Sequence, residues 1–147
     1  MRRKEARTMS EPTPTAPSNR PVVLVVDDEE DILESLTAVL EEFLPEAKVV
    51  GARSALMAQE LMKKTPPDVV VADFRMPGMN GLEFLSEIRD STNNVARIMM
   101  TAYPAIGLVV RAVNEARIQG LYIKPFDAMR MVEAIRQALK ERRVPAA

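Results

Sequence analysis

Short apolar runs alternate along the chain with longer segments in which apolar residues recur every three or four positions. The short runs are rich in β-branched residues, as is typical of strands buried on both faces of a parallel sheet. They predict five strands, at residues 22–26, 47–52, 68–73, 95–101 and 121–123. The longer segments that follow each strand predict five amphipathic helices.

This alternation of strand and helix predicts a parallel sheet covered on both faces by helices, through right-handed crossovers. The expected fold class is α/β: a flavodoxin-like, doubly wound (βα)5 sandwich with a five-stranded parallel sheet in the strand order 2-1-3-4-5. In such a fold the ligand crevice lies at the carboxyl ends of the first and third strands.

Local signals mark several helix ends. Ser54 is a predicted N-cap, and Asn80 with Glu83 three residues later predicts a capping box. Pro104 suits the first position of the fourth helix, which we expect to run to Glu115. The side chains expected to face inward are Ile32, Leu36, Val39, Leu40 and Phe43, then Ala55, Ala58, Leu61 and Met62, then Leu82, Leu85 and Ile88, and finally Val132, Ile135 and Leu139.

The composition supports one domain within the 147 residues, at residues 21–143. Residues 1–20 carry basic side chains and then a Pro/Thr/Ser stretch, which predicts a disordered tail, and residues 144–147 form a short second tail. The basic start lacks the apolar core of a secretory signal, and no apolar run could span a membrane. We therefore expect a cytoplasmic protein without a membrane partner.

Charge and residue usage exclude several kinds of chemistry. The formal net charge is −1, so no overall field favours nucleic acid, and no DNA-binding domain is expected in this chain. The chain has no cysteine, which excludes disulfides and thiolate chemistry, and no histidine, which excludes Ser-His triads and histidine metal sites. Any chemistry must therefore use carboxylates, hydroxyls, lysine, arginine or the backbone.

Polar residues of these kinds stand where the predicted strands end: Asp27 and Asp28, Asp73, Thr101 and Lys124. Carboxylates gathered at one sheet edge repel one another unless a cation shares the site. Oxygen ligands without His or Cys favour Mg²⁺, with Mn²⁺ as an alternative.

A carboxylate such as Asp73 can also act as a nucleophile and form an acyl phosphate. Lys124 and the Thr101 hydroxyl would then contact phosphoryl oxygens. Each residue taken alone also fits a cap, a turn or an ordinary strand end. Their convergence on one edge favours the functional interpretation.

Four segments resemble the receiver domain of two-component response regulators, in the expected order and covering about residues 21–143: VVLVVDDEED, VVVADFRMPGMNGLEFL, MTAY and LYIKPF. The resemblance implies Mg²⁺-dependent transfer of a phosphoryl group from a partner's phosphohistidine, on a sensor histidine kinase or a phosphotransfer protein. It also implies that the chain catalyses only its own phosphorylation and slow dephosphorylation, and is not a conventional enzyme.

The resemblance also assigns residues. It implies that Asp73 is the phosphoacceptor and that Asp27, Asp28, Asp73 and the backbone carbonyl of Arg75 hold the metal. Thr101 and Lys124 would contact the phosphoryl group. Pro125 resembles the family's cis proline.

The output end departs from the family pattern. The switch aromatic expected three residues before Lys124 is replaced by Leu121, and Tyr122 follows it. We name Thr101, Leu121 and Tyr122 as switch candidates. The helix from Pro104 is more apolar than one buried stripe requires, which predicts a dimer or partner surface on the face of the fourth helix, fifth strand and fifth helix.

Three other protein classes share parts of this pattern. An aspartyl-phosphate hydrolase of the haloacid dehalogenase type needs an acid two residues after its nucleophile, where this chain has Arg75. A flavodoxin needs a hydroxyl-rich phosphate loop after the first strand, which is absent. A pseudo-receiver, which keeps the fold but accepts no phosphate, is the main alternative.

Overall fold

The computed structural model describes residues 20–91 and 94–143, so the two predicted tails lie outside the described residues, apart from Arg20. The strands are β1 Val22–Val26, β2 Lys48–Ala52, β3 Val69–Asp73, β4 Ala96–Thr101 and β5 Gly120–Ile123. The helices are α1 Glu30–Phe43, α2 Ala55–Lys64, α3 Gly81–Arg89, α4 Ile106–Arg111, the π-helix η1 Ala112–Ala116 and α5 Ala128–Arg143.

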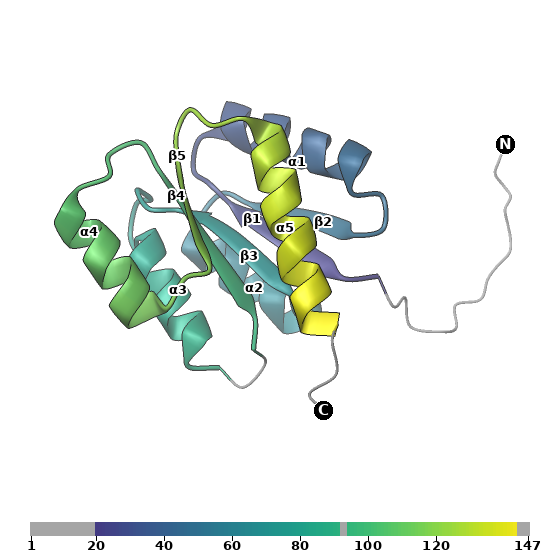
Figure 1. The fold of residues 1–147 in the computed structure, drawn as a ribbon. Coiled ribbons are helices and arrows are strands. Elements are labelled where there is room, and N and C mark those ends of the chain that lie inside the picture. Colours follow the sequence, from purple (N-terminus) through teal and green to yellow (C-terminus); the bar gives the residue numbers. More distant parts are fainter. Residues whose placement is uncertain (1–19, 92–93, 144–147) are drawn as a thin grey trace, which may run out of the picture.

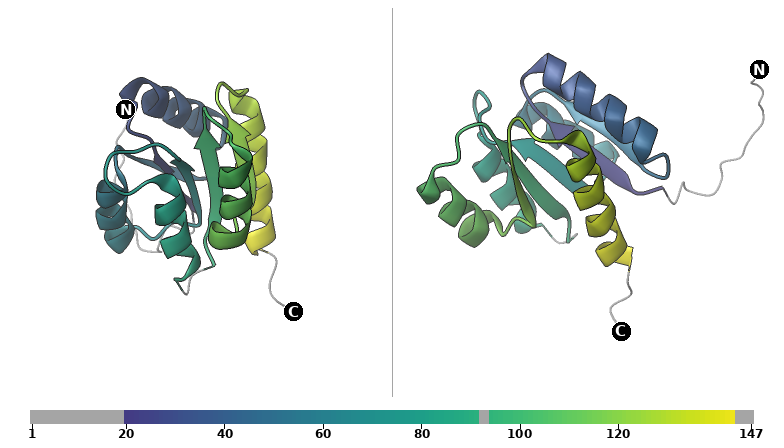
Figure 2. Two further views of the ribbon diagram at one scale, coloured as in Figure 1. Left: turned by 90° about the vertical axis from the view of Figure 1, so that its left-hand side faces the viewer. Right: turned by 45° about the horizontal axis from the view of Figure 1, so that its top comes forward.

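The strands form one parallel sheet in the order β2-β1-β3-β4-β5 (Figure 1), which confirms the predicted fold class and strand order. Helices α1 and α5 cover one face, and α2, α3 and α4 cover the other (Figure 2). Each face has its own buried cluster, because successive side chains of a strand point to opposite sides. In β1, for example, Val23 and Val25 pack on the α1 and α5 side, whereas Leu24 and Val26 pack on the other.

Helix caps follow the sequence signals. The Ser54 hydroxyl accepts a hydrogen bond from the Met57 N–H at 3.0 Å. The Asn80 side chain accepts from the Glu83 N–H at 2.8 Å, and the Glu83 carboxylate accepts from the Asn80 N–H at 3.0 Å. Both predicted caps are confirmed, and the second fixes the start of α3 directly behind the loop that follows Asp73.

The buried stripe of α1 differs from the prediction. Phe43, expected inside, is 42% exposed, whereas Leu33 is buried together with Leu36 and Leu40. Two overlapping apolar stripes run along this helix and share Leu36 and Leu40, so periodicity alone could not choose between them. In α2, the predicted Leu61 and Met62 are only half-buried.

The fourth helix also differs. Helix α4 starts at Ile106 with Ala105 as its N-cap, so Pro104 precedes the helix and does not occupy its first position. The Tyr103 N–H donates to the Thr101 hydroxyl at 3.1 Å, so the chain is still turning just before Pro104. Beyond Arg111 the helix widens into a π-helical turn, which apolar periodicity did not predict.

Candidate phosphoacceptor site

The candidate site lies at the carboxyl edge of the sheet, where four parallel strands end side by side. Asp27 and Asp28 directly follow β1, Asp73 ends β3, Thr101 ends β4 and Lys124 directly follows β5. Parallel pairing of β1 with β3, β3 with β4 and β4 with β5 brings these residues together from distant parts of the sequence. The structure therefore assembles the predicted constellation.

Lys124 is the centre of the polar contacts. Its Nζ lies 2.8 Å from Asp27 Oδ2 and 2.8 Å from Asp73 Oδ1. The Glu29 carboxylate lies on its outer side, with Oε1 at 3.3 Å. The side chains of Lys124, Asp27 and Asp73 are 10%, 0% and 7% exposed, so one ammonium group bridges two buried carboxylates.

The carboxylates outnumber the cation that they share. Ligand oxygens of Asp27, Asp28 and Asp73 all lie within 4.8 Å of one another. Burial raises the pKa of Asp73, the hydrogen bond from Lys124 opposes this, and the negative charges of Asp27 and Asp28 add to the rise. Ionised Asp73 is therefore less favourable here than in water.

The pKa of Lys124 responds in the opposite sense to its surroundings. Burial alone would lower it, but hydrogen bonds to Asp27 and Asp73, and the charges of both carboxylates, outweigh burial and raise it. The pKa of Asp73 and that of Lys124 are thus both raised. The two shifts are consistent, because one ammonium group neutralises only part of the charge of three nearby acids.

This donor set fits a hard divalent cation. Three carboxylates with no nitrogen or sulfur ligand favour Mg²⁺ or a similar ion over a transition metal. Because one ammonium group cannot neutralise three carboxylates, the remaining negative charge also favours the binding of a cation.

A hollow of about 410 Å³ opens above these groups and is lined in part by Asp28, Asp73, Thr101 and Lys124. Arg75 and Tyr103 form its rim, with the Arg75 guanidinium carbon 4.6 Å from the centroid of the Tyr103 ring. This cation–π contact joins the loop after β3 to the loop after β4 beside the hollow that Asp73 also lines. The hollow suits a tetrahedral anion held between a lysine and a hydroxyl.

Gly81 is a site residue that the sequence analysis missed. A Cβ atom added there would lie 2.3 Å from the backbone oxygen of Asp73 and 2.9 Å from Phe74 Cα. The Gly81 N–H also donates to the Phe74 carbonyl at 2.8 Å, which closes the loop. Only a residue without a side chain allows α3 to start this close to the end of β3. The signal available was a glycine directly after a capping asparagine.

Glu29 was also missed as a partner of Lys124. It is the N-cap of α1, yet its side chain makes no capping hydrogen bond and instead reaches Lys124. Its backbone N–H donates to Asp27 Oδ1 at 2.9 Å. Residue 29 therefore holds the site by both its backbone and its side chain.

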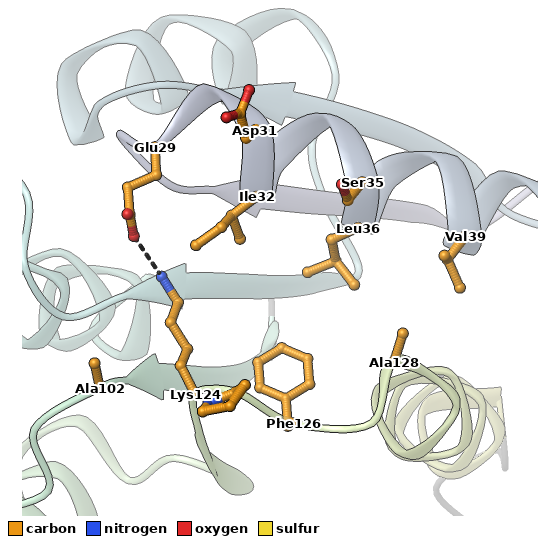
Figure 3. A pocket seen from close by; sticks show the side chains of 11 residues that line it. Glu29, Asp31, Ile32, Ser35, Leu36, Val39, Ala102, Lys124, Phe126 and Ala128 are labelled. Atoms are coloured by element: carbon orange, nitrogen blue, oxygen red, sulfur yellow. Dashed lines mark hydrogen bonds and ion pairs between the residues drawn. The ribbon is translucent and has the colours of Figure 1, made fainter.

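A second, largely apolar pocket of about 560 Å³ adjoins the site between α1 and the start of α5. Figure 3 shows Ile32, Leu36 and Val39 facing Phe126 and Ala128 across it, with the Glu29–Lys124 ion pair at one end. A molecule bound in this pocket would contact the lysine that faces Asp73.

The two switch candidates of β5 lie on opposite faces of the sheet. Leu121 packs against the buried cluster on the face covered by α3 and α4. Tyr122 packs against the cluster on the α1 and α5 side, and its ring meets Phe126 edge-on at 6.0 Å. The structure thus places Leu121, and not Tyr122, on the side of the sheet that α4 covers.

Comparison with known proteins identifies the family of this chain. The sequence model of the response regulator receiver domain matches residues 23–136. The chain therefore belongs to the response regulator receiver family.

Two relatives illustrate the range of proteins that contain this domain. The chain is 36% identical over 118 residues to the hydrogenase transcriptional regulatory protein HoxA of Cupriavidus necator, covering 80% of this chain and 24% of HoxA. It is 30% identical over 119 residues to the sporulation initiation phosphotransferase F of Bacillus subtilis, covering 81% of this chain and 90% of that protein. The chain thus spans about a quarter of the first relative and nearly all of the second.

Among solved structures, the signal receiver domain of an HD domain-containing protein from Pseudomonas fluorescens Pf-5 superposes with a TM-score of 0.77 at 30% identity, covering 86% of this chain and 99% of that one. Within residues 20–91 and 94–143, no helix is both long and apolar enough to cross a membrane.

Proposed function

We propose that this chain is a phosphorylatable receiver that takes a phosphoryl group onto Asp73 from a phosphohistidine on a sensor histidine kinase or a phosphotransfer protein. The observation that carries this proposal is the Lys124 ammonium held 2.8 Å from Asp73 in a buried cluster of carboxylates. The carboxylate would attack the phosphorus atom, forming a P–O bond as the P–N bond of the donor breaks and imidazole leaves.

Each neighbour has a role in this transfer. Lys124 would move from the free carboxylate to a phosphoryl oxygen, and the Thr101 hydroxyl would donate to another. Asp27, Asp28, Asp73 and the Arg75 carbonyl would hold Mg²⁺, which neutralises charge on the transferring group when it is bound. We infer a cytoplasmic setting, where kinases of this kind present their phosphohistidine.

The direct test is intact mass after incubation with Mg²⁺ and acetyl phosphate. A single phosphoryl adduct that disappears in Asp73→Asn supports the receiver. Absence of any adduct in the wild-type chain favours the pseudo-receiver, and rapid consumption of the donor without an adduct favours a hydrolase. Asp90→Asn, which changes an exposed aspartate on the far end of α3, is the matched control.

The output surface is proposed to be the face formed by α4, β5 and α5. Ile106, Val110 and Val113 are 83%, 50% and 53% exposed, and at this spacing they form one stripe along α4 and η1. Ile123 in β5 adds a further exposed apolar side chain. Homodimerisation through this face on phosphorylation would bury the stripe. Sedimentation with and without phosphodonor tests it, and Val110→Glu should keep the phosphorylated chain monomeric.

A further inference from the structure

Arg97 is a buried arginine that the phosphotransfer chemistry does not use. It belongs to β4, four residues before Thr101, and is 7% exposed. Its guanidinium donates to three backbone carbonyls: Nε to Ala116 at 2.8 Å, Nη2 to Arg117 at 2.9 Å, and Nη1 to Val95. The planar fork of donors suits such a set of fixed acceptors.

No carboxylate of the described residues forms an ion pair with Arg97, which is unusual for a buried charge. Burial lowers its pKa, and the nearby cations Arg89 and Arg117 lower it further. The compensation comes from three backbone carbonyls, of which those of Ala116 and Arg117 lie at the end of η1, where the backbone dipoles present partial negative charge.

The helix end that Arg97 holds is built tightly. Ala112 and Ala116 of η1 are fully buried, and η1 packs against α3. Arg117 follows in the left-handed conformation (φ 49°), and its N–H donates to the Ala112 carbonyl. A positive φ at a residue other than glycine costs energy, so the surrounding contacts must maintain it.

The opposite end of the same helix is built loosely. None of the residues of α4, Ile106–Arg111, is buried, and the N-cap Ala105 offers no side-chain hydrogen bond. Gly107 weakens this stretch further. The loose end lies next to the Thr101 loop, and the tight end lies where Arg97 joins it to the start of β4.

We propose that Arg97 is a positioning residue for the output helix, holding the carboxyl end of the α4–η1 segment on the sheet so that phosphorylation moves only its amino end. The exposed apolar stripe of α4 and η1 would then change its orientation by pivoting about Ala116 and Arg117. This inference rests on the proposed phosphorylation of Asp73.

Hydrogen exchange read by mass spectrometry tests the proposal on the full chain, before and after treatment with acetyl phosphate and Mg²⁺. Intact mass is measured first, so that failure to phosphorylate is recognised as failure of the receiver function and not of this inference. In the wild type, we expect phosphorylation to change exchange in residues 103–111 at least threefold and to leave residues 112–118 unchanged.

Arg97→Met removes the fork but keeps an unbranched side chain of similar length. The phosphoryl adduct should still form, but residues 112–118 should lose at least tenfold protection and should now respond to phosphorylation. Arg97→Lys keeps the charge without the fork and should show an intermediate response. Arg111→Met removes an exposed arginine of α4, paired with Glu115, and should behave as the wild type.

Three results would overturn the proposal. The first is residues 112–118 responding to phosphorylation in the wild type. The second is an unchanged exchange pattern in Arg97→Met. The third is loss of folding, seen by circular dichroism, in both the Met and the Lys variants, which would make Arg97 a residue of global stability. If only Arg97→Met unfolds, Arg97→Lys replaces it in the test, and an unchanged exchange pattern in residues 112–118 of Arg97→Lys overturns the proposal.

Discussion

Replacing Lys124 with methionine should show how strongly one ammonium group holds the acid cluster together. Lys124 Nζ lies 2.8 Å from both Asp27 and Asp73, whose side chains are 0% and 7% exposed. Methionine keeps an unbranched stem, but both carboxylates lose their cation. Removal of one partner from a buried ion pair costs about 3–5 kcal/mol. We expect a loss of about 3 kcal/mol in the free energy of unfolding, at the lower end of this range, because a carboxylate without its cation can bind a proton instead.

A divalent cation should compensate for the missing ammonium. An ion that binds only the folded state adds about 2.7 kcal/mol at 100 times its dissociation constant. Lys124→Met should therefore recover most of its stability in excess Mg²⁺. The wild type should gain less from the ion, because Lys124 already occupies part of the carboxylate cluster.

Urea unfolding followed by circular dichroism, in EDTA and in excess Mg²⁺, measures both effects. Lys140→Met, at an exposed position of α5, controls for loss of a lysine and should change stability by less than about 0.5 kcal/mol. Equal stability of Lys124→Met and the wild type in EDTA would refute the reasoning about the ion pair. An equal gain from Mg²⁺ in both chains would show that the ion and the lysine do not share the carboxylates.

Three further predictions concern single residues of the site. The pKa of Asp73 is raised in the folded chain, so without metal the folded state holds this proton more tightly than the unfolded state does. As the pH rises from the unfolded-state pKa through the folded-state pKa, the wild type should therefore lose stability relative to Asp73→Asn. Urea titrations at several pH values test the sign of this change. Gly81→Ala should destabilise the domain by about 1–3 kcal/mol, the usual cost of overpacking, because its Cβ would meet the Asp73 carbonyl oxygen at 2.3 Å. The same substitution should slow phosphorylation, so thermal melts and adduct formation should show both effects. Tyr103→Ala and Arg75→Asn should each change the rate of phosphate release several-fold, because each breaks the Arg75–Tyr103 contact beside the hollow. Unchanged rates in both variants would show that this contact does not control hydrolysis.

The fold and the clustering of the candidate site residues could be predicted because their signals are local and numerous. The inner strands β1, β3 and β4 are almost wholly buried and therefore read as mainly apolar runs, whereas the edge strands β2 and β5 are partly exposed. A polar residue ends or directly follows each of the five runs. The sheet topology then brings Asp27, Asp73 and Lys124 together without further information. The capping box of α3 was equally local, since both partners lie within four residues.

The errors arose where two patterns compete or where the cause lies outside the segment. In α1, overlapping apolar stripes made Phe43 and Leu33 equal candidates for the core, and only the position of the helix on the sheet separates them. Gly81 matters because of a backbone oxygen that precedes it by eight positions, and periodicity carries no sign of such a contact. Glu29 resembled one more acid in a helix start.

The output end depends most on tertiary structure, and there the sequence motif alone was ambiguous. Leu121 and Tyr122 are neighbours in sequence, but the pleat sends them to opposite faces, so only Leu121 lies on the side of α4. A tyrosine next to the family's switch position is therefore no substitute for an aromatic residue at that position. In the proposed receiver, coupling from Thr101 can instead pass through the loop that leads to the α4–η1 segment, whose near end is weakly held and whose far end is tied to β4 by Arg97. Because the proposed output segment is joined to β4 at both of its ends, the proposed response to phosphorylation needs no rotating aromatic ring.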